Sequence, residues 1–300
     1  MRPDVIIYGL GKHFETACGN GENLKHYNIV GHCDQNSKFS EKYSDYVHPS
    51  ELSEKEYDFI LITSIYYREI INRLVDTYGV DCEKIVIWDE EILRNSYFNE
   101  PGTKFAFAQF GEDYVISNIL KELEIPEKQA DYIEIGVDNP FKGNNTYFLH
   151  LAGARGVLIE ANPESIPLIK AVRKNQIVMN KVISDKRGKI PFYIADYPSL
   201  SSLSIENIKL NHGNVKDTIF LESVTINDVL AMQSNTVVLS IDIEGYDEIV
   251  LKSIDFKRYQ PKIICAEVGK PERELICYMN SKGYHLAFCN YINSIWKIDA

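Results

Sequence analysis

Short runs of β-branched and aromatic residues alternate with helix-compatible stretches along the first third of the chain. The apolar runs are 5–9, 28–34, 57–64 and 84–89, and the stretch 66–79 has helical character and ends at Gly79. Strands that are apolar along their whole length and separated by helices are typical of a parallel sheet covered on both faces. Glycine is also favoured just past a helix end. The pattern predicts a small α/β domain over residues 1–93.

A second, larger series of the same kind follows a polar break around Pro101 and Gly102. We predict a linker over residues 94–104 and a second domain over residues 105–300. Its expected elements are a helix at 111–123, strands at 131–136, 156–161, 180–184, 190–195, 237–244 and 262–268, and a closing antiparallel hairpin within 284–298. This order predicts a doubly wound α/β sheet that is mostly parallel and ends in an antiparallel hairpin.

Composition and charge narrow the class of protein. The chain has 300 residues, of which 45% are hydrophobic and 25% charged, as expected for a globular protein and not for a disordered one. Its net charge is −11, and residues 1–100 carry −8 of it, which argues against a nucleic-acid surface. Six scattered cysteines without a C-x-x-C pair indicate a reducing compartment. No apolar run approaches the roughly 18 residues of a membrane span, so we expect a cytoplasmic protein without a leader.

The stretch from Asp131 to Glu160 carries the most informative pattern. The first strand there ends in a turn at Gly136, where the missing side chain lets a ligand lie against the backbone. Glu160 closes the next strand about 20 residues later, where α/β folds bind a ribose diol. The dinucleotide pattern G-x-G-x-x-G is absent, and Asp138 disfavours a pyrophosphate. A carboxylate there suits an amino group and a sulfonium, which together with a ribose describe S-adenosylmethionine.

Four motifs resemble, in the same order, those of the FkbM-type S-adenosylmethionine-dependent methyltransferases. They are QFGED (109–113), YIEIGVDNP with NNTYF (132–140 and 144–148), GVLIEANP (156–163) and LSIDIEGYD (239–247). The resemblance covers about residues 105–298 and implies the class I methyltransferase fold. Two positions depart from the family pattern. Glu134 stands where the family usually has Asp, and V-D-N-P follows Gly136 in place of A-N-D-P, which leaves open whether Asp138 or Asn139 touches the cofactor.

The resemblance also implies roles for individual residues. Glu134 and Gly136 would flank the methionine part of the cofactor, and Glu160 would bind its ribose. Asn145 and Thr146 would cap the helix that follows, and the adenine is expected near Ile183 and Ser184. The segment from Gln109 to Asp113 would form a lid over the site.

Acidic residues end two consecutive apolar strands and are the candidates for the chemistry. Asp242 and Glu244 close one strand and Glu267 closes the next, and the carboxyl ends of neighbouring parallel strands meet at one crevice. Asp242 could be the base, could hold the acceptor hydroxyl, or could bind a divalent metal such as magnesium together with Glu267. Glu244 could instead start a helix. His212 is the second candidate base, and the serine-rich run 199–204 lines the acceptor site or is a plain connector.

The first domain resembles the Rossmann-like domain attached to some sugar-modifying enzymes. Gly9 and Gly11 form a G-x-G, and Asp34 ends the next strand, but the third glycine is missing and the charge disfavours a polyanion. We therefore favour a scaffold, dimerisation or acceptor-docking role over bound NAD. A homodimer is possible.

Three functions remain open from the sequence. The resemblance implies an O-methyltransferase that acts on a hydroxyl of a sugar, a nucleotide-linked sugar or a related small polar metabolite, in surface-polysaccharide or natural-product biosynthesis. The alternatives are an NAD-dependent nucleotide-sugar oxidoreductase or epimerase, and a non-catalytic nucleotide-binding module. The oxidoreductase or epimerase would need a tyrosine and a lysine in the pattern Y-x-x-x-K. Tyr193 has Tyr197 and not a lysine at that spacing.

Overall fold

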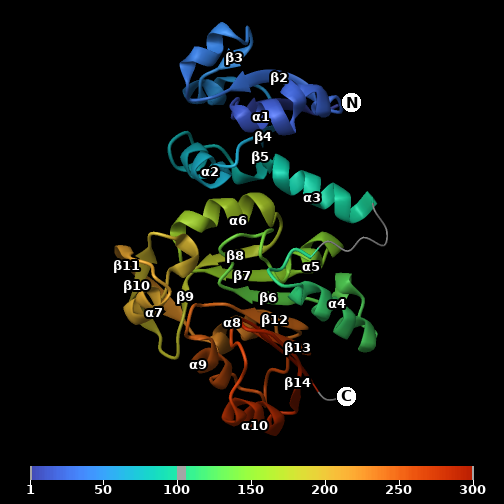
Figure 1. Ribbon diagram of the computed structural model, residues 1–300, viewed down its shortest axis with the longest axis vertical. Helices are drawn as coiled ribbons and strands as arrows, with labels where there is room; N and C mark the ends of the chain where they lie inside the picture. The colour runs from blue at the N-terminus through green and yellow to red at the C-terminus, as the bar shows by residue number, and fades with distance from the viewer. Residues whose placement is uncertain (1, 100–105, 299–300) are drawn as a thin grey trace. The chain divides into compact units, whose positions relative to one another are not determined.

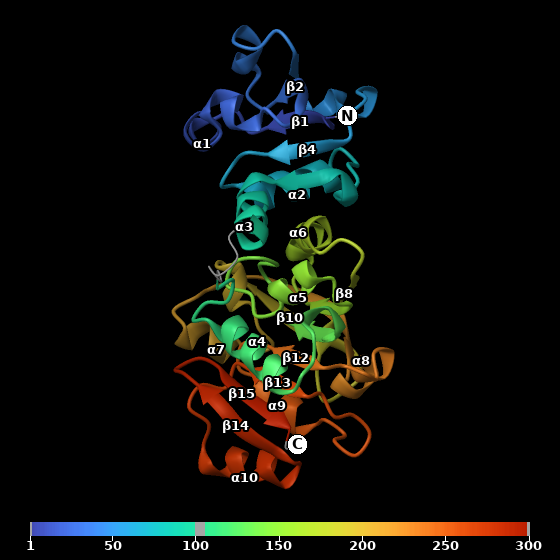
Figure 2. The ribbon, with the colours of Figure 1, turned by 90° about the vertical axis from the view of Figure 1, so that its right-hand side faces the viewer.

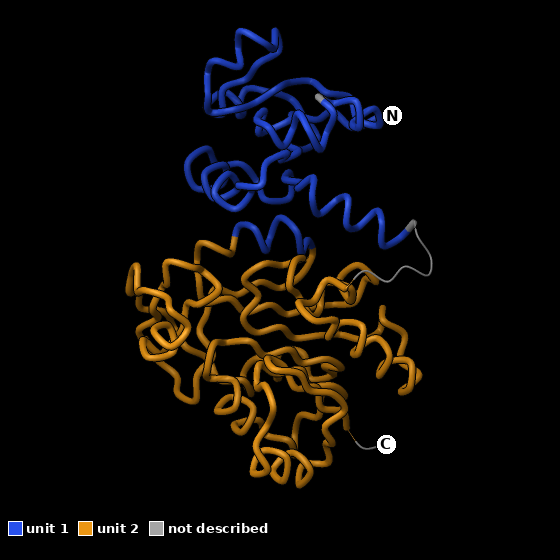
Figure 3. Tube along the Cα trace, viewed as in Figure 1, with its two compact units in different colours: residues 1–105, 167–174 blue, residues 106–166, 175–300 orange. Residues whose placement is uncertain are grey.

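A computed structural model describes residues 2–99 and 106–298 of the chain (Figure 1). Residue contacts divide the chain into two compact units, coloured separately in Figure 3. The first unit contains residues 1–105 and 167–174, and the second contains residues 106–166 and 175–300. Within the described part of the chain, no helix is both long and apolar enough to cross a lipid bilayer.

The first unit is built on a five-stranded sheet in which every pair of neighbours is parallel. In spatial order the strands are β3 (Tyr46–Val47), β2 (Asn28–Cys33), β1 (Asp4–Tyr8), β4 (Phe59–Ile62) and β5 (Ile85–Ile87), joined by helices α1 (Lys12–Ala17) and α2 (Tyr67–Asp76). The central strands β1 and β4 are buried almost throughout, as their unbroken apolar sequences predict. The α/β pattern expected for this region is confirmed, and the two-residue strand β3 is too short for the sequence to indicate.

Helix α3 (Trp88–Asn99) corrects part of the predicted linker, because residues 94–99 are helical. Three acidic residues, 89–91, occupy its first turn, where they interact favourably with the positive end of the helix dipole. Glu90 also pairs with Arg94 one turn later, at 3.7 Å between Oε1 and Nε. These polar residues favour a helix here, although they interrupt the apolar pattern. The rest of the predicted linker, residues 100–104, lies outside the described residues.

The second unit contains a seven-stranded mixed sheet. In spatial order its strands are β14 (Tyr284–Cys289), β15 (Ser294–Ile298), β13 (Ile263–Ala266), β12 (Val238–Ile241), β6 (Tyr132–Ile135), β7 (Gly156–Glu160) and β8 (Ile177–Asn180). The five strands from β13 to β8 are parallel, and β14 and β15 form an antiparallel hairpin at one edge. The predicted doubly wound sheet and its terminal hairpin are confirmed.

The helices of the second unit are α4 (Glu112–Glu122), α5 (Tyr147–Ala152), α7 (Ile205–Leu210), α8 (Ile226–Met232), α9 (Asp247–Lys252) and α10 (Arg273–Ser281), and α6 (Ile166–Val172) falls mostly in the first unit (Figure 2). Side chains such as Ile133, Leu239 and Ile264 pack with α8, α9 and α10 in one apolar core. Because strand side chains alternate between faces, Glu134 and Ser240 face the opposite side of the sheet. The core therefore fixes which polar side chains of β6 and β12 reach the other face.

A second, three-stranded sheet differs from the sequence-based expectation. The segment expected as one strand over 180–184 is divided between β8 and β9 (Val182–Ile183), and β9 pairs with β11 (Val215–Val224), which pairs in turn with β10 (Gly188–Ala195). Strand β11 was not predicted. Its side chains are mostly exposed, so it lacks the dense apolar run by which the buried strands are recognised.

Candidate active site

A cavity of about 460 Å³ opens where β6, β7, β12 and β13 end in the second unit. Six carboxylates line it, namely Glu134, Asp138, Glu160, Asp242, Glu244 and Glu267, and the lysines of its described lining are Lys142 and Lys181. The carboxyl edge of a parallel sheet is where α/β proteins bind ligands. This excess of carboxylates makes the cavity suited to a positively charged ligand.

Gly136 fixes the turn after β6. Its φ is +77°, a conformation that strongly favours glycine, and a Cβ at this position would overlap the backbone carbonyl of Asp242. The amide of Asp242 also donates to the carbonyl of Ile135, at 2.9 Å. The glycine therefore lets the loop after β6 pass directly against the loop after β12.

Glu160 holds the loop that follows Gly136. Its Oε2 accepts from the backbone N–H groups of Val137 and Asp138, both at 2.9 Å, and its Oε1 accepts from that of Asn162, at 2.6 Å. Burial raises the pKa of Glu160, although the three backbone donors act in the opposite direction. The carboxylate is thus fixed at the cavity wall. The sequence predicts at this position a group that binds the ribose diol.

Glu134 is buried and held by two side chains from the segment before α5. Asn144 donates through Nδ2 to its Oε1, and Thr146 donates through Oγ1 to its Oε2, both at 2.6 Å. The expected helix cap is therefore corrected. Thr146 occupies the N-cap position of α5, but its hydroxyl is directed to Glu134, and α5 has no side-chain cap bond. Asn145 instead donates to Ser240 Oγ at 3.4 Å and contacts Cys265.

Asp242 and Glu267 lie together in the cavity and share a hydrogen bond between their carboxyl groups. Burial, and then the charge of Glu267, raise the pKa of Asp242 well above its usual range. Burial and the charges of Glu244 and Asp247 raise the pKa of Glu267 to about 8. A proton shared between the two carboxyls at neutral pH follows from these shifts.

Glu244 joins this pair from a loop and not from a strand. Strand β12 ends at Ile241, so Asp242 and Glu244 both lie beyond the strand that was expected over 237–244. Glu244 instead has a φ of +53°, and its carboxyl is reached by Asn207 Nδ2 at 3.4 Å. Burial raises the pKa of Glu244 to about 7. Ligand oxygens of Asp242, Glu244 and Glu267 all lie within 4.8 Å of one another.

Asp247 supports the same loop from the first turn of α9. Its carboxylate accepts from the backbone N–H groups of Ile243, at 3.0 Å, and Gly245, at 3.2 Å. Burial raises the pKa of Asp247 to about 6 despite these donors. The sequence had suggested Glu244 for the role of an acidic residue at the helix start, but Asp247 holds that position.

The remaining predicted residues separate into those at the cavity and those away from it. Gln109 and Ile183 line it, as do the serines at 199 and 201. Asp113 and Ser184 do not belong to the lining, and Asp113 is buried, where it accepts from the backbone N–H of Phe107 at 2.6 Å. His212 is exposed in a turn with a φ of +60° and lies outside the lining.

Sequence reasoning missed two asparagines at the cavity. Asn144, which holds Glu134, lies beside the predicted Asn145 and Thr146 but was given no role. Asn211 lines the cavity next to His212, which does not. An amide has no pKa in the useful range and no fixed spacing from its partners, so no pattern in the sequence distinguishes such residues from surface asparagines.

The mostly parallel sheet, with an acidic cavity at the carboxyl ends of the neighbouring strands β6 and β12, is typical of the α/β enzymes that bind a cofactor at this edge. The FkbM methyltransferase domain model matches residues 134–286, just over half of the chain. The chain belongs to the FkbM methyltransferase family and is an S-adenosylmethionine-dependent methyltransferase, as the motifs had implied. The C2185-like amino-terminal model matches residues 1–86. No curated protein matches the chain.

The solved structures that are similar to the chain include three methyltransferases of low sequence identity. A putative O-methyltransferase from Klebsiella pneumoniae has 12% identity and a TM-score of 0.32, over 77% of this chain and 97% of that one. The O-methyltransferase from Bacillus cereus in complex with SAH has 10% identity and a TM-score of 0.35, over 77% and 97%. Magnesium protoporphyrin IX methyltransferase (ChlM) from Synechocystis PCC 6803 with bound SAM has 10% identity and a TM-score of 0.35, over 72% of this chain and 99% of that one. None of these likenesses identifies a substrate.

Proposed function

We propose that the cavity binds S-adenosylmethionine and that the chain methylates a hydroxyl of a sugar, a nucleotide-linked sugar or a related small polar metabolite. The observation that carries the cofactor site is the fixed carboxylate of Glu160 in an acidic cavity next to Gly136. The residues present fit this cofactor, because its ammonium and sulfonium groups are positive and would offset the repulsion among the six lining carboxylates. Its ribose offers the diol that the position of Glu160 favours.

Glu160 retains the capacity to bind a ribose hydroxyl. Its Oε2 already accepts from two backbone N–H groups, whereas Oε1 accepts from one within the described residues. A carboxylate oxygen has two lone pairs, so Oε1 can accept one further hydrogen bond. Glu134 and Gly136 then flank the methionine part, and Ile183 lies against the adenine.

The bound cofactor supplies an electrophilic methyl group. The chain aligns the acceptor hydroxyl and takes up its proton, and Asp242 is positioned for the second task. Because the two carboxyls share one proton, the pair keeps one negative charge, and its raised pKa values make that charge a better proton acceptor than an ordinary aspartate. Asn211 and the serines at 199 and 201 offer hydrogen bonds to a polar acceptor.

The same carboxyls fit a divalent cation. Asp242, Glu244 and Glu267 present oxygen ligands close enough to converge on one ion, and oxygen-only ligands favour magnesium or a similar hard ion. A cation held there would acidify a hydroxyl bound next to it. Burial raises the pKa values of all three carboxyls, and repulsion from a neighbouring carboxylate adds to the shift of Asp242 and Glu267. A cation bound among them would relieve that repulsion.

Calorimetry with S-adenosylmethionine tests the cofactor site. We expect Glu160→Ala to weaken binding at least about tenfold, because both the charge and the loop contacts are lost. Glu164→Ala is the matched control, since Glu164 is a surface residue whose carboxylate pairs with Lys216 at 3.5 Å. Equal affinities of the two variants would contradict the site. Incubation with methyl-labelled cofactor and a panel of free and nucleotide-linked sugars then tests the acceptor, and label on none of them would contradict the sugar assignment.

A further inference from the structure

A second cavity, of about 610 Å³, lies wholly within the first unit. It opens beyond the carboxyl ends of β1, β2 and β4 and is lined by the residues that follow them. Strand β1 pairs with β2 on one side and β4 on the other, so the chain changes direction across the sheet at this point. Such a switch point is where open parallel sheets bind ligands.

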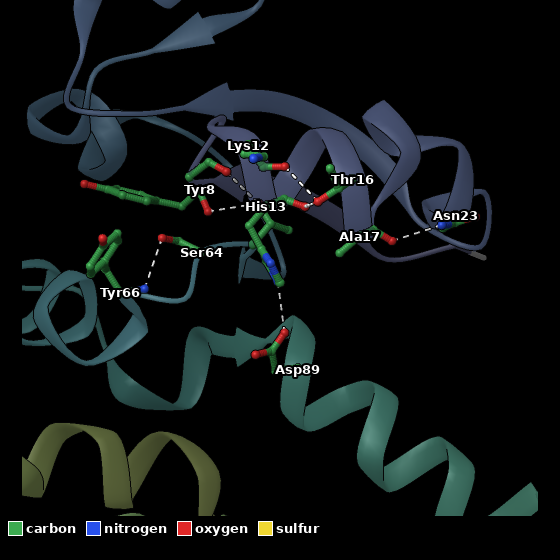
Figure 4. A network of polar contacts seen from close by, with 11 residues as sticks. Tyr8, Lys12, His13, Thr16, Ala17, Asn23, Ser64, Tyr66 and Asp89 are labelled. Carbon is green, nitrogen blue, oxygen red and sulfur yellow. Dashed lines mark hydrogen bonds and ion pairs between the residues drawn. The ribbon is translucent and has the colours of Figure 1, made fainter.

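Tyr8 provides a polar group that the protein leaves unused. Its side chain is 2% exposed, and its hydroxyl has no hydrogen-bond partner among the described residues. Buried polar groups are nearly always paired, so an unpaired hydroxyl at a cavity wall indicates a missing partner. Burial raises the pKa of Tyr8, so the hydroxyl stays protonated and can donate to a ligand. Figure 4 shows Tyr8 near Ser64 and Tyr66, which line the same cavity.

Gly11 leaves part of the cavity wall bare. A Cβ there would meet no atom within 4 Å among the described residues, and its φ of −80° is open to any residue. Gly9 differs, because its φ is +99° and its Cβ would lie 3.0 Å from that of Ser64. The fold therefore requires glycine at position 9 but not at position 11, where the missing side chain leaves room for a ligand.

Asp34 repeats in the first unit the arrangement of Glu160 in the second. It follows β2, and its Oδ2 accepts from the backbone N–H of Leu10 at 2.9 Å, as Glu160 accepts from Val137. Its Oδ1 accepts from Asn36, also at 2.9 Å. Each oxygen can therefore accept a further hydrogen bond, and because Asp34 lines the cavity, its carboxylate suits two adjacent hydroxyl groups.

The rim of the cavity combines an aromatic face with two cations. Tyr66 is 65% exposed, and its ring can pack against a planar base. Lys12 and Arg73 also line the cavity, while His13 is paired with Asp89, at 3.0 Å between Nε2 and Oδ1 (Figure 4). With Asp34 and Glu69 present as well, the lining is close to neutral and does not repel one or two phosphates, despite the negative charge of the unit as a whole.

We propose that this cavity is a ribonucleotide site, separate from the methyl-donor site. Asp34 accepts hydrogen bonds from the ribose diol, Tyr66 packs against the base, and Lys12 and Arg73 offset the charge of the phosphates. The bare backbone at Gly11 allows close approach of the ligand, and Tyr8 donates to it. This site does not depend on the proposed function of the second unit.

The test uses the full chain with its methyl-donor site filled by saturating S-adenosylhomocysteine. Calorimetry measures binding of UDP, ADP and their 2′-deoxy counterparts. We expect at least one of the two ribonucleotides to bind, and its deoxy form to bind about tenfold more weakly, because one hydroxyl of the diol is missing. Binding of both reports recognition of ribose and phosphate, and binding of one adds recognition of the base. Failure of both to bind would overturn the proposal and leave the methyltransferase assignment intact.

Variants locate the site and separate binding from folding. Gly11→Val and Asp34→Asn should each weaken binding about tenfold or more, whereas Asp76→Asn, which makes the same charge change at an exposed residue of α2 outside the cavity, should not. Tyr8→Phe should weaken binding severalfold without lowering the melting temperature, because it removes an unpaired buried hydroxyl. Unchanged affinity in both Gly11→Val and Asp34→Asn, with the variants folded, would contradict the assigned cavity.

Discussion

Gly136 lies against the backbone carbonyl of Asp242, with no room for a Cβ between them. The two residues directly follow β6 and β12, which are neighbouring parallel strands with Ile135 in register with Ile241. The turn next to the proposed donor site and the loop that carries the candidate base are therefore packed together. A change at one must displace the other, so the turn at Gly136 and the loop that carries Asp242 move together.

The first prediction concerns this contact. Gly136→Ala should lower the free energy of unfolding by about 3 kcal/mol or more, because it adds an overlap with backbone to the cost of a positive φ. Gly143→Ala is the matched control in the same cavity. Gly143 has a φ of +64° but no atom within 4 Å of its would-be Cβ in the described chain, so about 1 kcal/mol is expected. Chemical denaturation measures both, and equal losses would contradict the packing argument.

The second prediction concerns the partner of Glu134. Thr146→Val removes a hydrogen bond to this buried carboxylate and should cost about 2 kcal/mol of stability. Thr146→Ser keeps the hydroxyl and should restore most of the cofactor affinity that the valine variant loses. Thermal melting and calorimetry with S-adenosylmethionine check the two effects. If serine and valine behave alike, the hydroxyl does not position Glu134.

The elements that carry the buried sheet could be predicted from the sequence, because burial on both faces leaves a clear apolar signal. Strands β6, β7, β12 and β13 were located to within a few residues. The same signal fails at exposed elements, as β11 and the last turns of α3 show. Their stability depends on pairing with other strands or on charge placement, and neither leaves an apolar run.

The candidate site divides in a similar way. Gly136, Glu160, Asp242 and Glu267 could be found because strand ends place them at one edge of the sheet, which topology alone dictates. The hydrogen bond from Thr146 to Glu134, in place of one to the helix end, depends on how the loop over residues 136–146 folds back. His212 was a plausible base by chemistry, but the backbone turn at that residue leaves its ring exposed outside the cavity lining.

The third prediction is a pH dependence of the ligand-free protein. The folded-state pKa of Glu267, about 8, is raised above the ordinary value of 4.5, so the folded state binds more protons than the unfolded state between these values. Stability must then fall as the pH rises through this window. Glu244, with a pKa of about 7, acts in the same direction.

Glu267→Gln removes one of these charges and should flatten the dependence. We expect the wild-type melting temperature to fall by about 4 °C or more relative to the variant between pH 5 and pH 8. Glu274→Gln serves as the control, because that carboxylate is exposed and pairs with Lys252. Parallel melting curves for the wild type and Glu267→Gln across this range would show that the folded protein does not hold the extra protons.

The fourth prediction concerns the cation that Asp242, Glu244 and Glu267 could hold. Chelator treatment should lower turnover at least about tenfold and added magnesium should restore it, because the three carboxylates would otherwise repel one another in the cavity. Asp242→Asn should lower turnover about a hundredfold or more with or without chelator, since it removes both a metal ligand and the proton acceptor. Glu248→Gln, on the outer face of α9 where it pairs with Lys252, should leave both responses unchanged.

Wild-type turnover that is insensitive to chelator, with Asp242→Asn still impaired, would leave Asp242 as a base without a metal. Unchanged rates for Asp242→Asn under all conditions would exclude Asp242 from either role.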